Sequence, residues 1–235
     1  MTTTDASPAP ELDFVDADGH LVEPPFGLQD YAPAAFRDQI YHLEVDEAGD
    51  EWIVHGEQRM AANVFTLCGT GGFTDEERIR SHKGELKFSE LEGGCWNVKP
   101  RLADMDRDAI TQSVLYPTLF LSFQSQHPDD LVVAQCQAYN DFLTDHVAES
   151  GGRLHGIAVV PQRDPEAAAA EIRRVGGRPE IVGVQVRPNP AVDWKPMNDA
   201  VYDPLWRAAS DAGLPIGFHP LMSADLPGAV QGLRL

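Results

Sequence analysis

Cysteine is scarce in this sequence and shows no pairing pattern. The three cysteines, Cys68, Cys95 and Cys136, are odd in number and include no C-x-x-C spacing. Disulfide frameworks need paired cysteines, so these three are expected to be reduced thiols in a cytoplasmic protein. The sequence also lacks a G-x-S-x-G motif and any cysteine with a recognisable histidine partner. Both absences argue against nucleophilic catalysis.

Basic residues and long apolar runs are lacking as well. Lys and Arg total 18 against 37 Asp and Glu, which gives a formal net charge of -19. Nucleic acids and anionic membranes attract basic surfaces, so we expect neither as a partner. No apolar run approaches the ~20 residues that a membrane-spanning helix needs. No apolar segment follows a basic start, so no secretory signal is expected.

The sequence does contain a regular alternation of short apolar strands and amphipathic helices. With 235 residues, of which 43% are hydrophobic, the chain can bury a substantial core. The alternation repeats in units of roughly thirty residues, the size of a βαβ repeat. It predicts a parallel sheet covered by helices, an α/β fold. The expected strands are residues 14–17, 113–117, 154–160, 181–186 and 215–218. The expected helices are residues 102–109, 129–149 and two that begin at Asp164-Pro165 and Asp203-Pro204, with Asp as N-cap and Pro at the first helical position.

Two stretches depart from this alternation. Residues 1–13 are small, polar and proline-bearing, and are expected to form a disordered tail. Residues 24–100 form a long insertion after the first strand, with a hairpin predicted from strands 41–45 and 51–54 and a further turn at 55–57. The aromatic residues of this insertion are expected either to form a lid and apolar wall over a pocket or to pack a dimer contact. They are Trp52, Phe65, Phe73, Phe88 and Trp96.

Polar residues follow the ends of several expected strands. Asp18 and His20 follow the first, Arg187 and Asn189 follow the fourth, and His219 follows the fifth. An open doubly wound sheet and a (β/α)8 barrel both place such residues at one edge of the sheet. A barrel brings the ends of separate strands around one mouth, so this pattern favours the barrel.

Asp18 and His20 are two residues apart, which places their side chains on the same side of an extended strand. Imidazole suits zinc, and a carboxylate beside it extends the choice toward manganese. The alternative is an Asp and a His in an ordinary polar turn. Asp16 is a nearby competitor for the role of ligand. Glu23 is expected either to orient His20 from the second coordination sphere or to be a turn-start acid before Pro24.

Four stretches, in order along the chain, resemble a known family. They are FVDADGHLVEPP (14–25), KPRLADMDRDAITQSVLYP (99–117), VGVQVRPNP (182–190) and YDPLWRAASDAGLPIGFHP (202–220). Together they resemble the amidohydrolase-related family that includes aminocarboxymuconate-semialdehyde decarboxylase and the resorcylate-type decarboxylases. The resemblance implies a metal-dependent TIM barrel whose first strand supplies two metal ligands, at positions that correspond to Asp18 and His20. It implies a third ligand at the end of the fifth strand, which corresponds to His219, and an aspartate at the end of the eighth.

The number of expected strands departs from this family pattern. Five strands are recognised and the sequence ends soon after the fifth, so strands six to eight and the eighth-strand aspartate are absent. We therefore expect residues 14–235 to form a partial barrel, the N-terminal portion of a longer enzyme. The alternative is a natural short form that completes its barrel by pairing with another chain. Five strands leave both edges of the sheet unpaired, which favours association, so a homo-oligomer is expected.

The residues and the resemblance together predict a metal-dependent decarboxylase or hydrolase of a small, often aromatic, carboxylic acid. One divalent metal ion is expected, zinc first and manganese as the alternative. Arg187 and Asn189 are predicted to bind the substrate, because an arginine can clamp a carboxylate through two hydrogen bonds. The alternative for Arg187 is a surface salt bridge. The non-enzymatic alternative is an inactive fragment or interaction module without a complete metal site.

Overall fold

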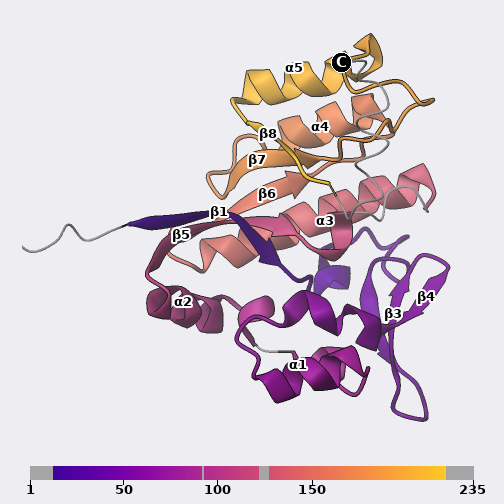
Figure 1. The fold of residues 1–235 in the computed structure, drawn as a ribbon. Helices are drawn as coiled ribbons and strands as arrows, with labels where there is room; N and C mark the ends of the chain where they lie inside the picture. Colours follow the sequence, from indigo (N-terminus) through magenta and orange to yellow (C-terminus); the bar gives the residue numbers. More distant parts are fainter. Residues whose placement is uncertain (1–12, 92, 122–126, 221–235) are drawn as a thin grey trace, which may run out of the picture.

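The computed structural model describes residues 13–91, 93–121 and 127–220. It contains a five-stranded sheet, a three-stranded sheet and the helices that connect and cover them (Figure 1). The tail predicted for residues 1–13 lies outside the described residues except for Asp13, and so does the part of the partial barrel predicted for 221–235. Among the helices of the described ranges, none combines the length and the apolar character needed to cross a membrane.

The five-stranded sheet is the parallel sheet of the predicted barrel. Its strand order is β1-β5-β6-β7-β8, and every neighbouring pair is parallel. The strands are β1 (Phe14–Leu21), β5 (Ile110–Pro117), β6 (Leu154–Val159), β7 (Ile181–Val186) and β8 (Ile216–Phe218). The five strands expected from the sequence are therefore present in the expected order, and they form part of a (β/α)8 barrel.

Strand β1 is longer than expected and carries an irregularity. It pairs with β5 along its whole length, and its register shifts between Asp16 and Gly19. Asp18 and His20 therefore lie inside the strand, so the expected strand of residues 14–17 was too short. A bulge or irregularity of this kind changes which side of the sheet the following side chains face.

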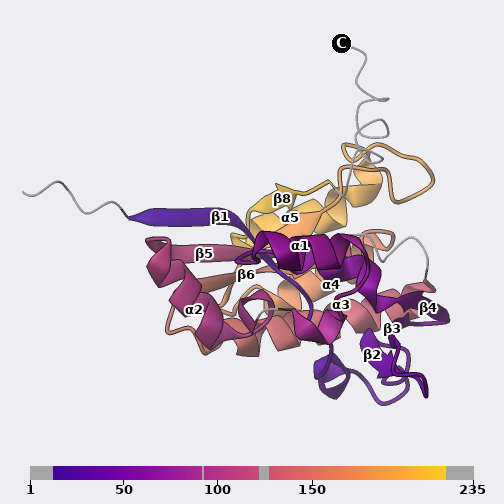
Figure 2. The ribbon, with the colours of Figure 1, turned by 60° about the horizontal axis from the view of Figure 1, so that its bottom comes forward.

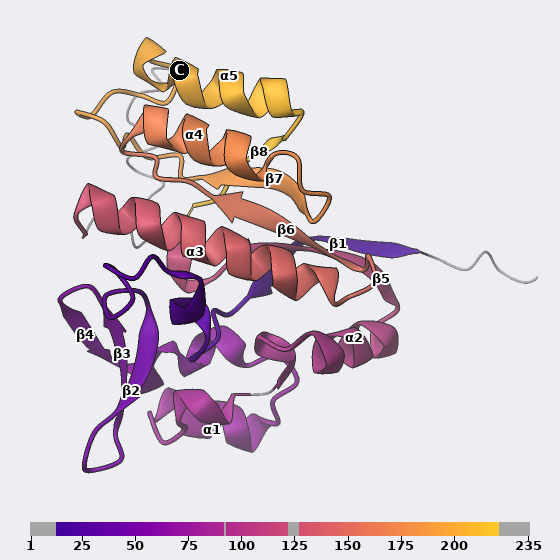
Figure 3. The same cartoon turned by 180° about the vertical axis from the view of Figure 1, so that it is seen from behind.

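Three helices cover the face of the large sheet that is turned toward the viewer in Figure 3. They are α3 (Asp129–Ala148), α4 (Pro165–Val175) and α5 (Asp203–Ala212). A further helix, α2 (Val98–Arg107), precedes β5 and corresponds to the helix expected at residues 102–109. It begins and ends earlier than the sequence predicted, and Pro100 lies in its first turn, where a missing N–H costs no helical hydrogen bond.

The two helix starts predicted from Asp-Pro differ in how they are capped. Asp164 is the N-cap of α4, and its side chain accepts the backbone N–H of Ala167. Asp203 is already inside α5, so the expected N-cap role is wrong for this residue. A 3-10 turn (Ala200–Tyr202) directly precedes α5. The capping side chain belongs to this turn, where Asp199 accepts the backbone N–H of Val201.

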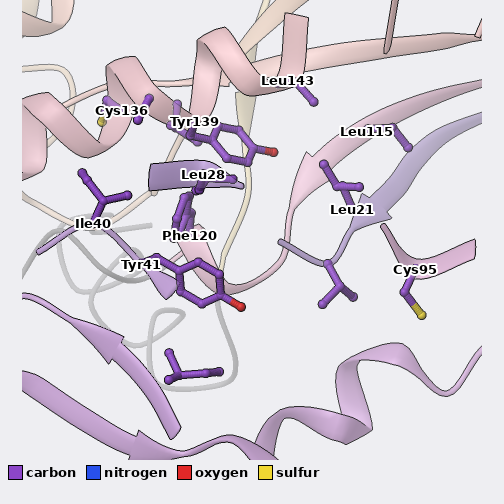
Figure 4. Packing of buried hydrophobic residues seen from close by; sticks show 14 of the residues in the cluster. Leu21, Leu28, Ile40, Tyr41, Cys95, Leu115, Phe120, Cys136, Tyr139 and Leu143 are labelled. Atoms are coloured by element: carbon purple, nitrogen blue, oxygen red, sulfur yellow. The ribbon is translucent and has the colours of Figure 1, made fainter. Parts of the chain in front are cut away.

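The main hydrophobic core lies between α3, the large sheet and the insertion. On α3, the residues at the predicted helical spacing are all buried, namely Val132, Cys136, Tyr139, Leu143 and Val147. Figure 4 shows Phe120 close to the rings of Tyr139 and Tyr41, with centroid separations of 5.2 and 5.5 Å. Edge-to-face contacts of this kind add to the free energy gained by burying the rings. Leu21 of β1 and Leu115 of β5 pack in the same core, which anchors the end of β1.

The insertion contains the predicted hairpin. Its small antiparallel sheet consists of β2 (His42–Val45), β3 (Glu51–His55) and β4 (Gln58–Ala61), and α1 (Asp75–His82) follows (Figure 2). Phe73 and Phe88 are buried and belong to the same core cluster as Tyr139 of α3. These two aromatic residues therefore help to pack the insertion against the barrel. A lid function for residues 24–100 stays a prediction.

Candidate metal centre

Three potential metal ligands meet where the C-terminal ends of β1 and β8 approach each other. The side chains of Asp18, His20 and His219 each offer one ligand atom, and these atoms all lie within 4.8 Å of one another. The Nε2 atoms of His20 and His219 are 3.2 Å apart, and Asp18 Oδ1 lies 3.4 Å from the His219 Nε2 and 4.0 Å from the His20 Nε2. Two ligands bound tetrahedrally to one ion at about 2.1 Å lie about 3.4 Å apart, so these separations suit a common ion.

The curvature of the sheet brings these ligands together. His20 and His219 are 199 residues apart in the sequence. Their strands are the two outermost in the order β1-β5-β6-β7-β8. A flat sheet would hold its outermost strands well apart, whereas a sheet that curves toward a barrel lets their carboxyl ends face each other. The partial barrel is therefore what assembles the three ligands.

Backbone carbonyl groups fix the tautomers of both histidines. His20 Nδ1 lies 2.8 Å from the Pro117 carbonyl oxygen, and His219 Nδ1 lies 3.0 Å from that of Pro220. A carbonyl oxygen only accepts, so each Nδ1 carries the proton and each Nε2 presents a lone pair. Two lone pairs that face each other at 3.2 Å repel unless a cation lies between them. Two imidazole nitrogens and a carboxylate oxygen are a donor set that fits zinc or manganese.

His20 is in the protonation state that a metal ligand needs. Burial lowers the pKa of His20, and the neighbouring His219 also lowers it, whereas the hydrogen bond to Pro117 and the charge of Asp18 act in the opposite direction. The net shift is downward, so the His20 imidazole is neutral at neutral pH and its Nε2 lone pair is available for coordination.

The backbone of His20 is held by Arg101. One terminal guanidinium nitrogen of Arg101 donates to the His20 carbonyl oxygen at 2.6 Å and to that of Cys95 at 3.3 Å. Arg101 belongs to α2, so these bonds tie the end of β1 to the helix that precedes β5. Because a guanidinium keeps its charge and its planar fork of donors when buried, it suits this role better than a lysine would.

Glu23 holds the loop that orients the His20 ring. Its fully buried carboxylate accepts the backbone N–H groups of residues 118–120 at 3.1, 2.7 and 3.1 Å. This loop follows Pro117, whose carbonyl oxygen accepts from the His20 ring. Burial raises the pKa of Glu23 to about 7, and the N–H donors act in the opposite direction. Glu23 thus acts on His20 through the backbone and not by accepting a hydrogen bond from its ring, which is an indirect form of the expected orienting role.

The irregularity of β1 separates Asp16 from the ligand cluster. The Asp16 carboxylate accepts the hydroxyl of Ser113 at 2.9 Å and the backbone N–H of Asp18 at 3.2 Å. Glycine is needed at position 19, because a β-carbon there would lie 2.3 Å from Ser113 Oγ and 2.5 Å from Asp16 Oδ2. Asp16 therefore stabilises the strand, and Asp18 is the carboxylate that joins the two histidines.

Arg187 and Asn189 follow β7, and Gln162 fixes their backbone. The Gln162 side chain accepts the Arg187 N–H at 2.9 Å and donates to the carbonyl oxygens of Arg187 and Asn189 at 2.9 and 3.4 Å. These bonds position the turn at the carboxyl edge of the sheet, the edge that carries the ligand cluster. Neither residue is one of the three clustered ligands. Their part in substrate binding stays a prediction.

Sequence reasoning missed Arg101 and Tyr116 and did not predict that Glu23 acts on His20 through the backbone. Arg101 and Glu23 act on backbone groups far away in the sequence, so no local pattern identifies them. Tyr116 is different, because its ring lies 5.1 Å from that of His219 and 6.3 Å from that of His20. It lies near the carboxyl end of an expected strand, as the other site residues do, and this position could have identified it.

Two curated relatives of this chain are named as decarboxylases. The 2-amino-3-carboxymuconate-6-semialdehyde decarboxylase of Dictyostelium discoideum is 26% identical over 165 residues, which is 67% of this chain and 45% of that protein. The gamma-resorcylate decarboxylase of a Polaromonas species is 33% identical over 85 residues, or 34% of this chain and 26% of that protein. The matches thus span less than half of the length of either relative.

Solved structures share the fold. An amidohydrolase from Mycobacterium avium subsp. paratuberculosis superposes with a TM-score of 0.68 at 22% identity, over 95% of this chain and 63% of the other. The 5-carboxyvanillate decarboxylase of Novosphingobium aromaticivorans, with bound manganese, superposes with a TM-score of 0.56 at 22% identity, over 91% of this chain and 52% of the other. The family model described as amidohydrolase matches residues 15–233. The chain therefore belongs to the amidohydrolase family.

Proposed function

We propose that this chain carries the metal-binding part of a metal-dependent decarboxylase that acts on small aromatic carboxylic acids. The observation that supports this most directly is the cluster of Asp18, His20 and His219, whose ligand atoms lie within 4.8 Å of one another at the carboxyl edge of the sheet. Relatives named as decarboxylases support the reaction class. A neighbour with bound manganese and a substituted benzoic acid supports the ligand class.

The residues of the cluster would hold one divalent ion. Zinc follows from the imidazole-rich donor set, and manganese follows from the neighbouring structure, so both are candidates. When bound, the metal supplies Lewis-acid chemistry toward a substrate oxygen. The chain itself contributes the fixed tautomers of His20 and His219 and the negative charge of Asp18. Arg187 and Asn189 would hold a carboxylate group of the substrate at the same edge.

A hydrolase is the second candidate function. The family model that matches the chain is described as amidohydrolase. A bound divalent metal can lower the pKa of water to about 7 and deliver hydroxide to an amide, ester or lactone. The same three ligands would serve both reactions, so substrate chemistry has to separate them.

Metal analysis of the purified 235-residue chain is the first test. We expect about one equivalent of zinc or manganese after loading, and loss of that metal in His219→Ala and in Asp18→Ala. His82→Ala is the matched control, because His82 is exposed on α1 and lies outside the ligand cluster. A wild-type chain that takes up no metal, or takes up as much as His219→Ala does, would contradict the proposal. That result would favour an interaction module without a complete metal site.

The reaction is tested on the metal-loaded chain with hydroxybenzoates, muconate semialdehydes and lactones. Release of carbon dioxide from the acids indicates a decarboxylase, and release of protons from the lactones indicates a hydrolase. Because β1 and β8 are the edge strands of the sheet, we also propose that the chain associates with itself. Analytical ultracentrifugation of the same sample gives the oligomeric state, and a monomer at all concentrations would contradict that association.

A further inference from the structure

We propose that Tyr116 forms the floor of the metal centre and that its hydroxyl donates a hydrogen bond to the aromatic acid held there. This inference rests on the proposed function and deepens it. It assigns a substrate contact to a residue that is not a metal ligand and that lies on β5, far along the sheet from β8.

The Tyr116 side chain reaches across the inner side of the curved sheet. Its ring centroid lies 5.1 Å from that of His219, directly after β8, and 6.3 Å from that of His20 on β1. Two other strands, β6 and β7, separate β5 from β8 in the sheet. A side chain that touches both outermost strands must therefore lie in the concave space below the three ligands.

Gly217 shows where the hydroxyl end of Tyr116 lies. A β-carbon on Gly217 would be 2.2 Å from the Tyr116 hydroxyl oxygen and 3.1 Å from Cε1 and Cζ of the ring. Gly217 is two residues before His219, so its missing side chain would point to the same side of β8. The phenol thus occupies the layer directly beneath His219, and only glycine at position 217 leaves room for it.

The Tyr116 hydroxyl is available to a ligand. Within residues 13–91, 93–121 and 127–220, no side chain or backbone group forms a hydrogen bond with it. The residue is half-buried, so a small molecule can reach it. A phenol is protonated at neutral pH and therefore a donor. An acid held beside a metal ion at Asp18, His20 and His219 would have its ring or its ortho oxygen next to this donor.

The central test compares Tyr116→Phe with the wild type in the metal-loaded protein. The substitution keeps the ring as the floor and removes only the donor. We expect the affinity for 2,6-dihydroxybenzoate, measured by calorimetry, to fall at least about tenfold, as for loss of one hydrogen bond to a charged or polar ligand atom. We expect the affinity for Mn2+ alone to stay within about twofold, since Tyr116 is not a ligand.

A second test examines the floor itself and does not depend on any substrate. Gly217→Ala should push the Tyr116 ring toward His219 and weaken Mn2+ binding about tenfold, as other changes next to metal ligands do. Tyr116→Phe removes the hydroxyl that an alanine at position 217 would meet. In that background, Gly217→Ala should therefore weaken Mn2+ binding by less than about threefold. Gly177→Ala is the control, because a β-carbon there meets no atom within 4 Å.

The outcomes separate this inference from the proposed function. If the wild type binds Mn2+ but none of the aromatic acids, the proposed substrate class is wrong, and so is the hydrogen bond from Tyr116 to such an acid. If the wild type binds the acid and Tyr116→Phe binds it equally well, only the inference is overturned. If Tyr116→Phe weakens Mn2+ and acid binding by the same factor, Tyr116 is a structural residue. If the effects of Gly217→Ala and Tyr116→Phe on Mn2+ affinity are additive, the Tyr116 ring does not form the floor of the metal centre.

Discussion

The Nε2 atoms of His20 and His219 face each other at 3.2 Å, and each ring turns its Nδ1 toward a backbone carbonyl. Both Nε2 atoms carry lone pairs in this arrangement. Their repulsion destabilises the folded state when no cation is present, and a bound divalent ion converts it into attraction. The stability of this protein should therefore depend on metal.

Removal of metal should lower the melting temperature. An ion present at 100 times its dissociation constant stabilises the folded state by about 2.7 kcal/mol, or roughly 5–10 °C for a chain of this size. Scanning calorimetry with Mn2+ or Zn2+ and with a chelator measures the shift. His219→Ala should abolish it, whereas His82→Ala should keep it. A shift of equal size in His219→Ala would place the bound ion elsewhere.

Replacement of Glu23 should weaken both stability and metal binding. Its carboxylate accepts the N–H groups of residues 118–120, and a glutamine would offer one acceptor oxygen in place of two. We expect Glu23→Gln to cost about 1–3 kcal/mol and to weaken Mn2+ binding about tenfold, because the Pro117 carbonyl that orients His20 loses its support. Glu76→Gln, on the exposed face of α1, is the control for stability. Unchanged metal affinity in Glu23→Gln would refute the orienting role.

The buried His55 should make the fold sensitive to acid. Burial and the neighbouring His127, whose ring centroid is 3.9 Å away, lower the pKa of His55 to about 3. The unfolded chain binds a proton at His55 near its ordinary pKa of 6.5, so between pH 6.5 and about 3 the unfolded state carries more protons. Stability is therefore lost as pH falls through this window.

The size of this loss can be isolated with one variant. At pH 5, the loss of folding free energy caused by His55 is about 2 kcal/mol, because each pH unit below 6.5 costs about 1.36 kcal/mol. His55→Phe keeps a ring against Phe120 and His127 but cannot be protonated. Urea denaturation at pH 7 and at pH 5 should show a smaller decrease for His55→Phe than for the wild type. Parallel decreases in the two proteins would mean that other groups cause the acid sensitivity.

Asn140 should be important for stability but not for the site. Its buried side chain donates to the Val159 carbonyl oxygen at 2.9 Å and to Glu171 at 2.6 Å, and accepts the Val159 N–H at 2.9 Å. Asn140→Ala removes all three of these hydrogen bonds, although Glu171 keeps those from Arg174. We expect the loss to lower the free energy of unfolding by about 3 kcal/mol and the melting temperature by roughly 6–12 °C. Asn63→Ala, which removes one bond near the surface, should cost under about 1 kcal/mol. Mn2+ affinity should be unchanged in both, and a loss in Asn140→Ala would link α3 to the metal centre.

The sequence by itself determined the features that depend on local spacing. The face of α3 that carries Tyr139 follows from steps of three and four residues, because that period is the period of the helix. The cap of α4 by Asp164 follows from the Asp-Pro pair. The pairing of Asp18 with His20 follows from a two-residue step on an extended strand. These predictions needed no knowledge of the rest of the chain.

The tertiary structure decided everything that depends on contacts between distant segments. The irregularity that removes Asp16 from the cluster arises in the pairing of β1 with β5. Gly19 permits it, but the register shift itself is set by contacts with β5. Glu23, Arg101 and Tyr116 act on groups that are distant in sequence or on another strand. Asp18 and His20 become part of a three-ligand centre only because the sheet curves until β8 brings His219 to them. Local spacing is encoded by neighbouring residues, whereas curvature and register are decided by the packing of the whole sheet.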